Sequence, residues 1–107
     1  MVIERFAVHL INLDPTVGSE IQKTRPCVVV SPDVLNSRLR TAIVAPLTTT
    51  IRPYAFRINC KFRGKPGQIA LDQIRTVDQS RFVRRLGALN PDEQTKVLDV
   101  LRDMFAP

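Results

Sequence analysis

Short apolar runs separated by turn-forming residues recur along this chain, and this pattern constrains the fold more than any other feature of the sequence. Such runs, rich in β-branched and aromatic residues, are typical of β-strands, and their near-regular spacing predicts a small β-barrel. The segments at 32–37 and 72–78 are expected to form a helical turn and an irregular polar stretch, respectively. We expect strands at residues 6–13, 27–31, 41–47, 54–62, 68–71 and 81–86.

The expected first strand is apolar on both of its alternating faces, which indicates a strand covered on both sides. His9 lies inside this run, so a place in the core or at a subunit interface is expected rather than catalysis. It is the only histidine of the chain, so one subunit cannot assemble the two-imidazole acid and base pair that many ribonucleases use.

Residues 90–105 predict the only clear helix, which makes the fold mainly β with a C-terminal α-helix. Asn90 is a favoured N-cap, Pro91 suits the first helical position, and Glu93 completes a capping box. Apolar residues then recur at steps of three and four, and this stripe is expected to pack on the barrel or on a partner subunit. The stripe consists of Val97, Leu98, Leu101, Met104 and Phe105.

The 107 residues are expected to form a single domain, 1–107, with one core. The net charge is +6, and it is unevenly distributed: residues 91–107 hold four acidic and two basic side chains, so residues 1–90 carry +8. This excess favours a polyanionic partner, either a nucleic acid or an acidic peptide.

Cys27 and Cys60 lie in or at the end of apolar runs, lack CxxC spacing and have one histidine to join them, so structural burial is expected rather than a metal site. No signal-peptide pattern and no apolar run of membrane-spanning length is present, so a cytoplasmic location without membrane association is expected.

The sequence also lacks the motifs of several enzyme classes. It has no glycine-rich phosphate loop with lysine, no HxxxH, no acidic metal cluster and no GxSxG. Nucleotide hydrolysis and metal-dependent nuclease chemistry are therefore disfavoured, and no cofactor is expected.

A polar segment, residues 18–25, runs directly into the apolar strand at 27–31. Pro26 biases Arg25 toward an extended backbone, so Arg25 is expected at the mouth of a rigid strand. Glu20, Lys23 and Arg25 place three charges within six residues, more than a simple hairpin needs. The alternative is a solvated loop with a surface arginine.

Several motifs in order along the chain resemble the MazF/PemK toxins of bacterial toxin–antitoxin systems. The resemblance spans nearly the whole chain, and the order and spacing of the motifs carry it. The matching pieces are Leu13-Asp14-Pro15-Thr16, Gly18-Ser19-Glu20, Lys23-Thr24-Arg25-Pro26, Val28-Val29-Val30-Ser31-Pro32, Pro46-Leu47-Thr48-Thr49 and Asp72-Gln73.

This resemblance implies a homodimer of SH3-like barrels, each with a C-terminal helix. It implies a sequence-specific endoribonuclease that cleaves single-stranded mRNA without metal, leaves a 2′,3′-cyclic phosphate and a 5′-hydroxyl, and so inhibits translation and growth. The implied partner is an acidic MazE-like antitoxin whose flexible tail blocks the RNA groove.

The resemblance places the catalytic pair at Arg25 and Thr48. The guanidinium would stabilise the phosphoryl oxygens and the hydroxyl would donate a hydrogen bond to the same group. Arginine does not readily accept a proton, so Glu20 is either the base or the residue that holds Arg25, with the holding role preferred. The predicted RNA-binding residues are Ser19, Gln22, Lys23, Thr49, Arg52, Lys61, Arg63, Lys65, Asp72 and Gln73.

The chain departs from the family pattern at two places. Its first strand begins Arg5-Phe6-Ala7 instead of with the usual Arg-Gly-acid motif, and Ala70 stands where some PemK-type members carry an arginine two residues before the Asp-Gln pair. Two alternative functions remain open: a CcdB-like gyrase poison, which the absence of tryptophan disfavours, and an RNA-binding barrel that does not cut.

Overall fold

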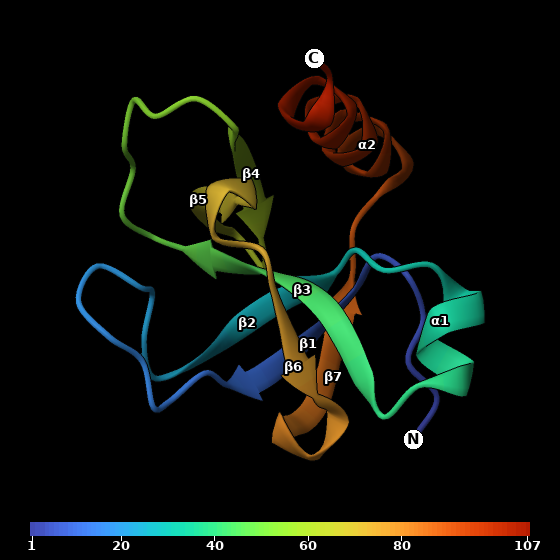
Figure 1. The fold of residues 1–107 in the computed structure, drawn as a ribbon. Helices are drawn as coiled ribbons and strands as arrows, with labels where there is room; N and C mark the ends of the chain where they lie inside the picture. Colours follow the sequence, from blue (N-terminus) through green and yellow to red (C-terminus); the bar gives the residue numbers. More distant parts are fainter.

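Strand β3 (Thr41–Thr48) is the centre of the fold in the computed structural model, which describes all residues 1–107 (Figure 1). One edge of β3 pairs with β2 (Thr24–Val29). The other edge pairs first with β6 (Arg75–Asp78) and then with β5 (Lys65–Ala70). Because all three pairings are antiparallel and share one strand, β3 fixes the positions of three neighbours.

The sheet has the strand order β4-β5-β3-β2-β1-β7, with β6 paired to β3 beside this path. It curves strongly without closing, so the expected mainly β, barrel-like fold with a C-terminal helix is confirmed. The remaining elements are β1 (Ala7–Asn12), α1 (Asp33–Arg38), β4 (Arg57–Phe62), β7 (Phe82–Ala88), α2 (Pro91–Phe105) and the 3₁₀ helices Leu71–Gln73 and Gln79–Arg81.

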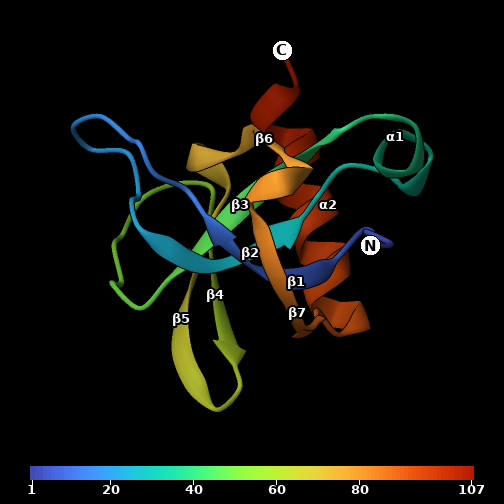
Figure 2. The ribbon, with the colours of Figure 1, turned by 90° about the horizontal axis from the view of Figure 1, so that it is seen from below.

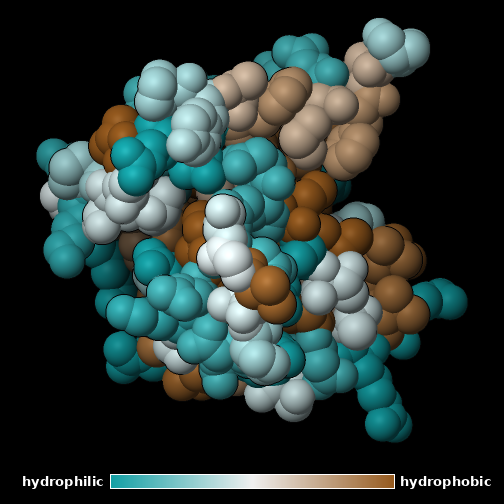
Figure 3. All heavy atoms as spheres, turned by 60° about the vertical axis from the view of Figure 1, so that its left-hand side comes forward, coloured by the Kyte–Doolittle hydropathy of each residue, from teal (hydrophilic) through white to brown (hydrophobic).

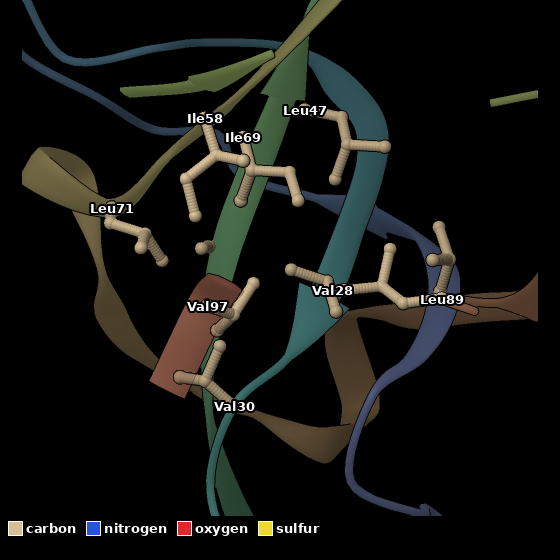
Figure 4. Packing of buried hydrophobic residues seen from close by; sticks show 10 residues of the cluster. Val28, Val30, Leu47, Ile58, Ile69, Leu71, Leu89 and Val97 are labelled. Carbon is tan, nitrogen blue, oxygen red and sulfur yellow. The ribbon is translucent and has the colours of Figure 1, made fainter. Parts of the chain in front are cut away.

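Alternate residues of the central strands enter two separate cores, one on each face of the sheet, so the expectation of one core is wrong. In β2, Val28 packs into the first core and Cys27 into the second. The first core includes side chains from the β4–β5 hairpin and α2, and Figure 4 shows them pointing toward one another around Val97. β1 contributes Val8 to the first core and Ile11 to the second, so its expected coverage on both sides is confirmed.

Two long loops lie on the same side of the molecule. They are the loop between β1 and β2, residues 13–23, and the loop between β3 and β4, residues 49–56. Both ribbon views show them side by side at one end of the sheet (Figures 1 and 2). The polar residues singled out in the sequence therefore gather on one face.

Residues 75–78 form strand β6, so the expectation of an irregular polar stretch is wrong for this part of 72–78. The sequence gives no strand pattern here because Val77 is the only buried residue of β6. Pairing of residues 75–78 with residues 41–44 of β3 determines the structure instead. Helix α1 is the short helical segment expected near 32–37.

The β4–β5 hairpin turns more tightly than expected. Arg63 and Gly64 alone form the turn, with φ angles of 51° and 79°, as a type I′ turn requires. β5 therefore begins at Lys65 rather than at residue 68, and β4 begins at Arg57 rather than at Tyr54.

Helix α2 begins as predicted. The Asn90 side chain accepts a hydrogen bond from the Glu93 backbone N–H at 2.8 Å, and the Glu93 carboxylate accepts one from the Asn90 N–H at 3.0 Å. Val97 is fully buried in the first core, but Phe105 is 71% exposed, so this chain leaves the end of the predicted stripe uncovered. Neither helix is long and apolar enough to cross a membrane.

His9 lies in the core, which is one of the two locations expected from the sequence. Its side chain is fully buried, and its ring packs edge-on against Phe82 with the centroids 5.0 Å apart. Neither ring nitrogen has a hydrogen-bond partner in the protein. Burial lowers the pKa of His9 below its ordinary value, and the nearby Arg85 charge lowers it further.

We predict that His9 makes the stability depend on pH. Unfolded histidine titrates near pH 6.5, whereas the folded protein resists binding this proton, so the unfolded state binds more protons as the pH falls. The free energy of unfolding should therefore be retained above about pH 6.5 and decrease below it. Denaturant titrations between neutral and mildly acidic pH measure this.

The matched control is His9→Phe, which keeps a ring against Phe82 and removes the titrating group. The difference in unfolding free energy between the two proteins should change with pH in this window. A constant difference would show that His9 binds its proton equally well in both states.

Candidate active site

The β2–β3 pairing brings Arg25 and Thr48 to the same end of the two strands. Cys27 pairs with Pro46, and continuing this antiparallel register by two residues places Arg25 opposite Thr48. Arg25 is the second residue of β2 and Thr48 is the last residue of β3. The predicted catalytic pair therefore lies at one end of two central strands, at the side that carries the two long loops.

The two side chains are held differently. Arg25 is half-buried, and its Nε–H donates to the Gln22 carbonyl at 2.5 Å. Thr48 is 8% exposed, and its hydroxyl oxygen accepts a hydrogen bond from the Thr50 N–H at 3.1 Å. This acceptor contact leaves the hydroxyl hydrogen available as a donor, and the remaining guanidinium N–H groups are likewise available.

Two open cavities meet at this pair. The cavity between the two loops, here called the loop cavity, has a volume of about 540 Å³. The cavity beside the β4–β5 hairpin, here called the hairpin cavity, has a volume of about 290 Å³. Arg25 and Thr48 are the only residues that line both. Figure 3 looks onto this side of the molecule, where hydrophilic residues cover the left and lower parts of the view and hydrophobic ones lie near the centre and toward the right.

Most of the predicted site residues lie in these two cavities. The lining of the hairpin cavity has no acidic side chain and four basic ones, which are Arg25, Arg63, Lys65 and Arg84. Ser19, Glu20, Gln22, Arg52, Asp72 and Gln73 line the loop cavity, whereas Thr49, Arg63 and Lys65 line the hairpin cavity.

Lys23 and Lys61 line neither cavity. Lys23 has a positive φ of 73°, and its backbone N–H and C=O are used to hold the β1–β2 loop. Lys61 lies on β4 between Cys60 and Phe62, which line the hairpin cavity, so strand alternation points Lys61 to the other face. These two predicted RNA contacts are not part of the site that the structure forms.

Glu20 does not hold Arg25, and the preferred role for it is wrong in this structure. Its carboxylate oxygen Oε1 accepts a hydrogen bond from the Val17 N–H at 2.6 Å, within its own loop. The ion pairs of the chain are Arg57 with Asp72 and Arg102 with Asp99. Glu20 still lines the loop cavity, so its role as a base stays a prediction.

Asp72 and Gln73 hold other parts of the site in place. The Gln73 amide accepts from the Ile21 N–H at 2.6 Å and donates to the Ser19 carbonyl at 3.2 Å, which fixes the β1–β2 loop. Asp72 accepts two hydrogen bonds from Arg57, at 2.7 and 3.1 Å. Both side chains therefore organise the loop cavity as well as line it.

Gln68 and Gly67 on β5 perform similar tasks and were missed in the sequence. The Gln68 side chain is buried and bonds both the N–H and the C=O of Arg52, each at 3.0 Å, which fixes the β3–β4 loop. A Cβ at Gly67 would lie 2.5 Å from the Thr48 carbonyl oxygen, so glycine is required beside the catalytic pair. The sequence does offer one signal, a polar glutamine directly beside an apolar run, because a glutamine that becomes buried there must form hydrogen bonds.

Both cysteine thiols have pKa values above the ordinary range. Burial raises the pKa of Cys27 to about 12, and it raises that of Cys60 to about 11, with the Glu93 charge adding to the second shift. Cys27 is fully buried and Cys60 is half-buried, in line with the expected structural role. No group of three or more His, Cys, Asp or Glu side chains is arranged to hold a metal ion.

The similarity of this chain to known proteins extends over nearly its whole length. Residues 4–105 match the family model described as PemK-like, MazF-like toxin of type II toxin–antitoxin system. The chain is 34% identical to endoribonuclease EndoA of Bacillus subtilis over 99% of this chain and 97% of that protein. It is 36% identical to endoribonuclease PemK of Escherichia coli over 78% of this chain and 68% of that protein.

Solved structures share the fold. MazF of Deinococcus radiodurans superposes with a TM-score of 0.85 at 24% identity, covering 97% of this chain and 96% of that one. A mycobacterial endoribonuclease in complex with its cognate antitoxin gives a TM-score of 0.81 at 21% identity, with the same coverage of both chains. With the family model matched almost from end to end, this chain belongs to the PemK-like, MazF-like toxins of type II toxin–antitoxin systems.

Proposed function

We propose that this protein is the toxin of a toxin–antitoxin pair and acts as an endoribonuclease on single-stranded RNA. The observation that carries this proposal is that Arg25 and Thr48 lie where two cavities meet. An RNA strand with nucleotides in both cavities would have a phosphate between them, beside a guanidinium and a hydroxyl. The relatives named as endoribonucleases favour this activity over gyrase binding or RNA binding without cleavage.

The proposed reaction uses the RNA as its own nucleophile. The ribose 2′-oxygen attacks the adjacent phosphorus, the bond from phosphorus to the 5′-oxygen breaks, and the products are a 2′,3′-cyclic phosphate and a 5′-hydroxyl. One proton leaves the 2′-hydroxyl and one reaches the departing 5′-oxygen. Negative charge grows on the phosphoryl oxygens during this step, and preorganised donors at that place lower the barrier.

Arg25 and Thr48 are suited to stabilise that charge. The strand register and the contact to Gln22 hold the Arg25 guanidinium before substrate arrives, so little reorganisation is required. The Thr48 hydroxyl has its hydrogen available for a phosphoryl oxygen. Glu20 is the candidate base, because the contact to Val17 uses only one of its two carboxylate oxygens.

We propose a homodimer, because β7 is an edge strand with Val83 exposed and α2 ends with Phe105 exposed. An acidic antitoxin segment would compete with RNA for the basic hairpin cavity, as a partner of the kind present in the mycobacterial complex. We place this single-domain toxin, residues 1–107, in the cytoplasm, where mRNA is translated.

We predict that the purified protein cleaves single-stranded RNA in the presence of EDTA and that Arg25→Ala slows cleavage by about 10²-fold or more. Losing one preorganised donor to the transition state has a cost of this order. RNA affinity should fall less than the rate does, because Arg25 contributes most to the charge that develops during reaction. Gel-based cleavage rates and binding to a 2′-O-methyl RNA measure the two effects separately.

Thr48→Val is the companion variant, since it keeps the shape of the side chain and removes the donor. It should also slow cleavage while the protein remains folded. Cleavage that disappears with EDTA and returns with Mg²⁺ would contradict the proposed chemistry.

The basic lining of the hairpin cavity predicts that the salt dependence of RNA binding arises partly there. Binding of single-stranded RNA weakens with salt at a slope of about −0.7 for each neutralised phosphate. Replacing both Arg63 and Lys65 by Ala should flatten this slope by up to about two such steps. The control is Lys61→Ala, which removes the same charge from the opposite face of the hairpin and should leave the slope nearly unchanged. A Lys61→Ala variant that flattens the slope as much per lost charge as the double variant does would place the RNA elsewhere on the hairpin.

A further inference from the structure

Tyr54 is an exposed aromatic ring in a cavity lined mainly by polar residues. It lies in the β3–β4 loop, is 56% exposed and lines the loop cavity together with Arg25 and Thr48. An exposed aromatic ring loses the hydrophobic contribution that burial would give, so its place beside the candidate catalytic pair requires an explanation.

One side of the Tyr54 ring is covered by the Arg57 guanidinium, whose central carbon lies 5.0 Å from the ring centroid. The Arg57 side chain is only 6% exposed, and Asp72 binds it through both Nε and Nη2, at 2.7 and 3.1 Å. The hydrogen bond to Asp72 also raises the pKa of Arg57. The guanidinium is therefore fixed in position and orientation beneath the ring.

The backbone on either side of Tyr54 is anchored as well. Before it, both backbone groups of Arg52 are bound by the buried Gln68 side chain. After it, the Phe56 carbonyl accepts a hydrogen bond from the Leu71 N–H at 3.2 Å. The ring is thus held between two fixed points of the loop, which reduces the entropy that a ligand must remove on binding.

We propose that Tyr54, supported by Arg57, is a stacking platform for a nucleobase next to the phosphate that is cut. This inference rests on the proposed function and adds a base-contacting residue that the sequence pattern did not indicate. Every nucleobase has a flat apolar face, and proteins that bind single strands use exposed aromatic rings with cationic neighbours for this contact. The loop cavity supplies space for a base and polar groups around its edge.

The chain offers a direct spectroscopic test. It contains one tyrosine and no tryptophan, so tyrosine emission reports on Tyr54 alone. The probe is a mixed-sequence single-stranded 2′-O-methyl RNA, which lacks the nucleophilic hydroxyl, and free N-acetyltyrosinamide corrects for light that the RNA absorbs. We expect the emission to be quenched along the same saturation curve as binding measured by anisotropy.

Variants separate stacking from a structural role. Tyr54→Ala should weaken binding of the probe by about 5- to 150-fold, the range found for loss of one base–aromatic stack. Tyr54→Phe should restore most of that affinity and of the cleavage rate. Tyr54→Leu keeps an apolar side chain but removes the aromatic face. This variant should bind the probe as weakly as Tyr54→Ala does.

The matched control is Phe56→Ala, which removes another exposed aromatic ring of the same loop that lines neither cavity. It should bind the probe as the unchanged protein does. Absence of quenching at saturating probe, or binding by Tyr54→Ala within about twofold of the unchanged protein, would overturn the platform. Failure of the unchanged protein to cut RNA would instead refute the proposed function, and the quenching experiment would still decide about Tyr54.

Discussion

Pairing of both edges of β3 is the constraint on which the site depends. β2 on one edge brings Arg25 to the end of the sheet where Thr48 lies, and β5 on the other edge brings Gly67 against the Thr48 backbone. These are backbone hydrogen bonds inside a sheet whose two faces are both covered by core residues. The two groups that are proposed to meet the phosphate are therefore placed by paired strands of the sheet, as preorganised charge stabilisation requires.

The loops around this pair are fixed by side-chain amides rather than by secondary structure. Gln73 holds the β1–β2 loop and Gln68 holds the β3–β4 loop, and both come from the β5 region of the chain. The Asp72–Arg57 pair adds a third connection. Each contact joins segments far apart in sequence, so the cavities are formed by the fold as a whole and can be lined by polar groups without collapsing.

Local patterns in the sequence predicted most of the fold, whereas the proposed catalytic pair, Arg25 and Thr48, came from the family resemblance. The capping box at Asn90 and the apolar runs act over a few residues, and the structure forms a helix and strands there, although β2, β4 and β5 begin at other residues than expected. Features that depend on partners distant in sequence were not predictable in the same way. β6 exists through pairing with β3, and Arg57 joins the site through its ion pair with Asp72, which is 15 residues away in the sequence. Glu20 was assigned to Arg25 from nearness in sequence, but a closer backbone N–H binds it.

The central claim is that the phosphate to be cut lies between Arg25 and Thr48, with a nucleotide in each cavity. A crystal structure of the protein with an RNA carrying one 2′-deoxy nucleotide at the mapped cleavage site tests this most directly. The account predicts that phosphate within hydrogen-bond distance of both side chains and bases on either side, in the loop cavity and the hairpin cavity. An RNA strand whose unreacted phosphate lies away from this pair would contradict it.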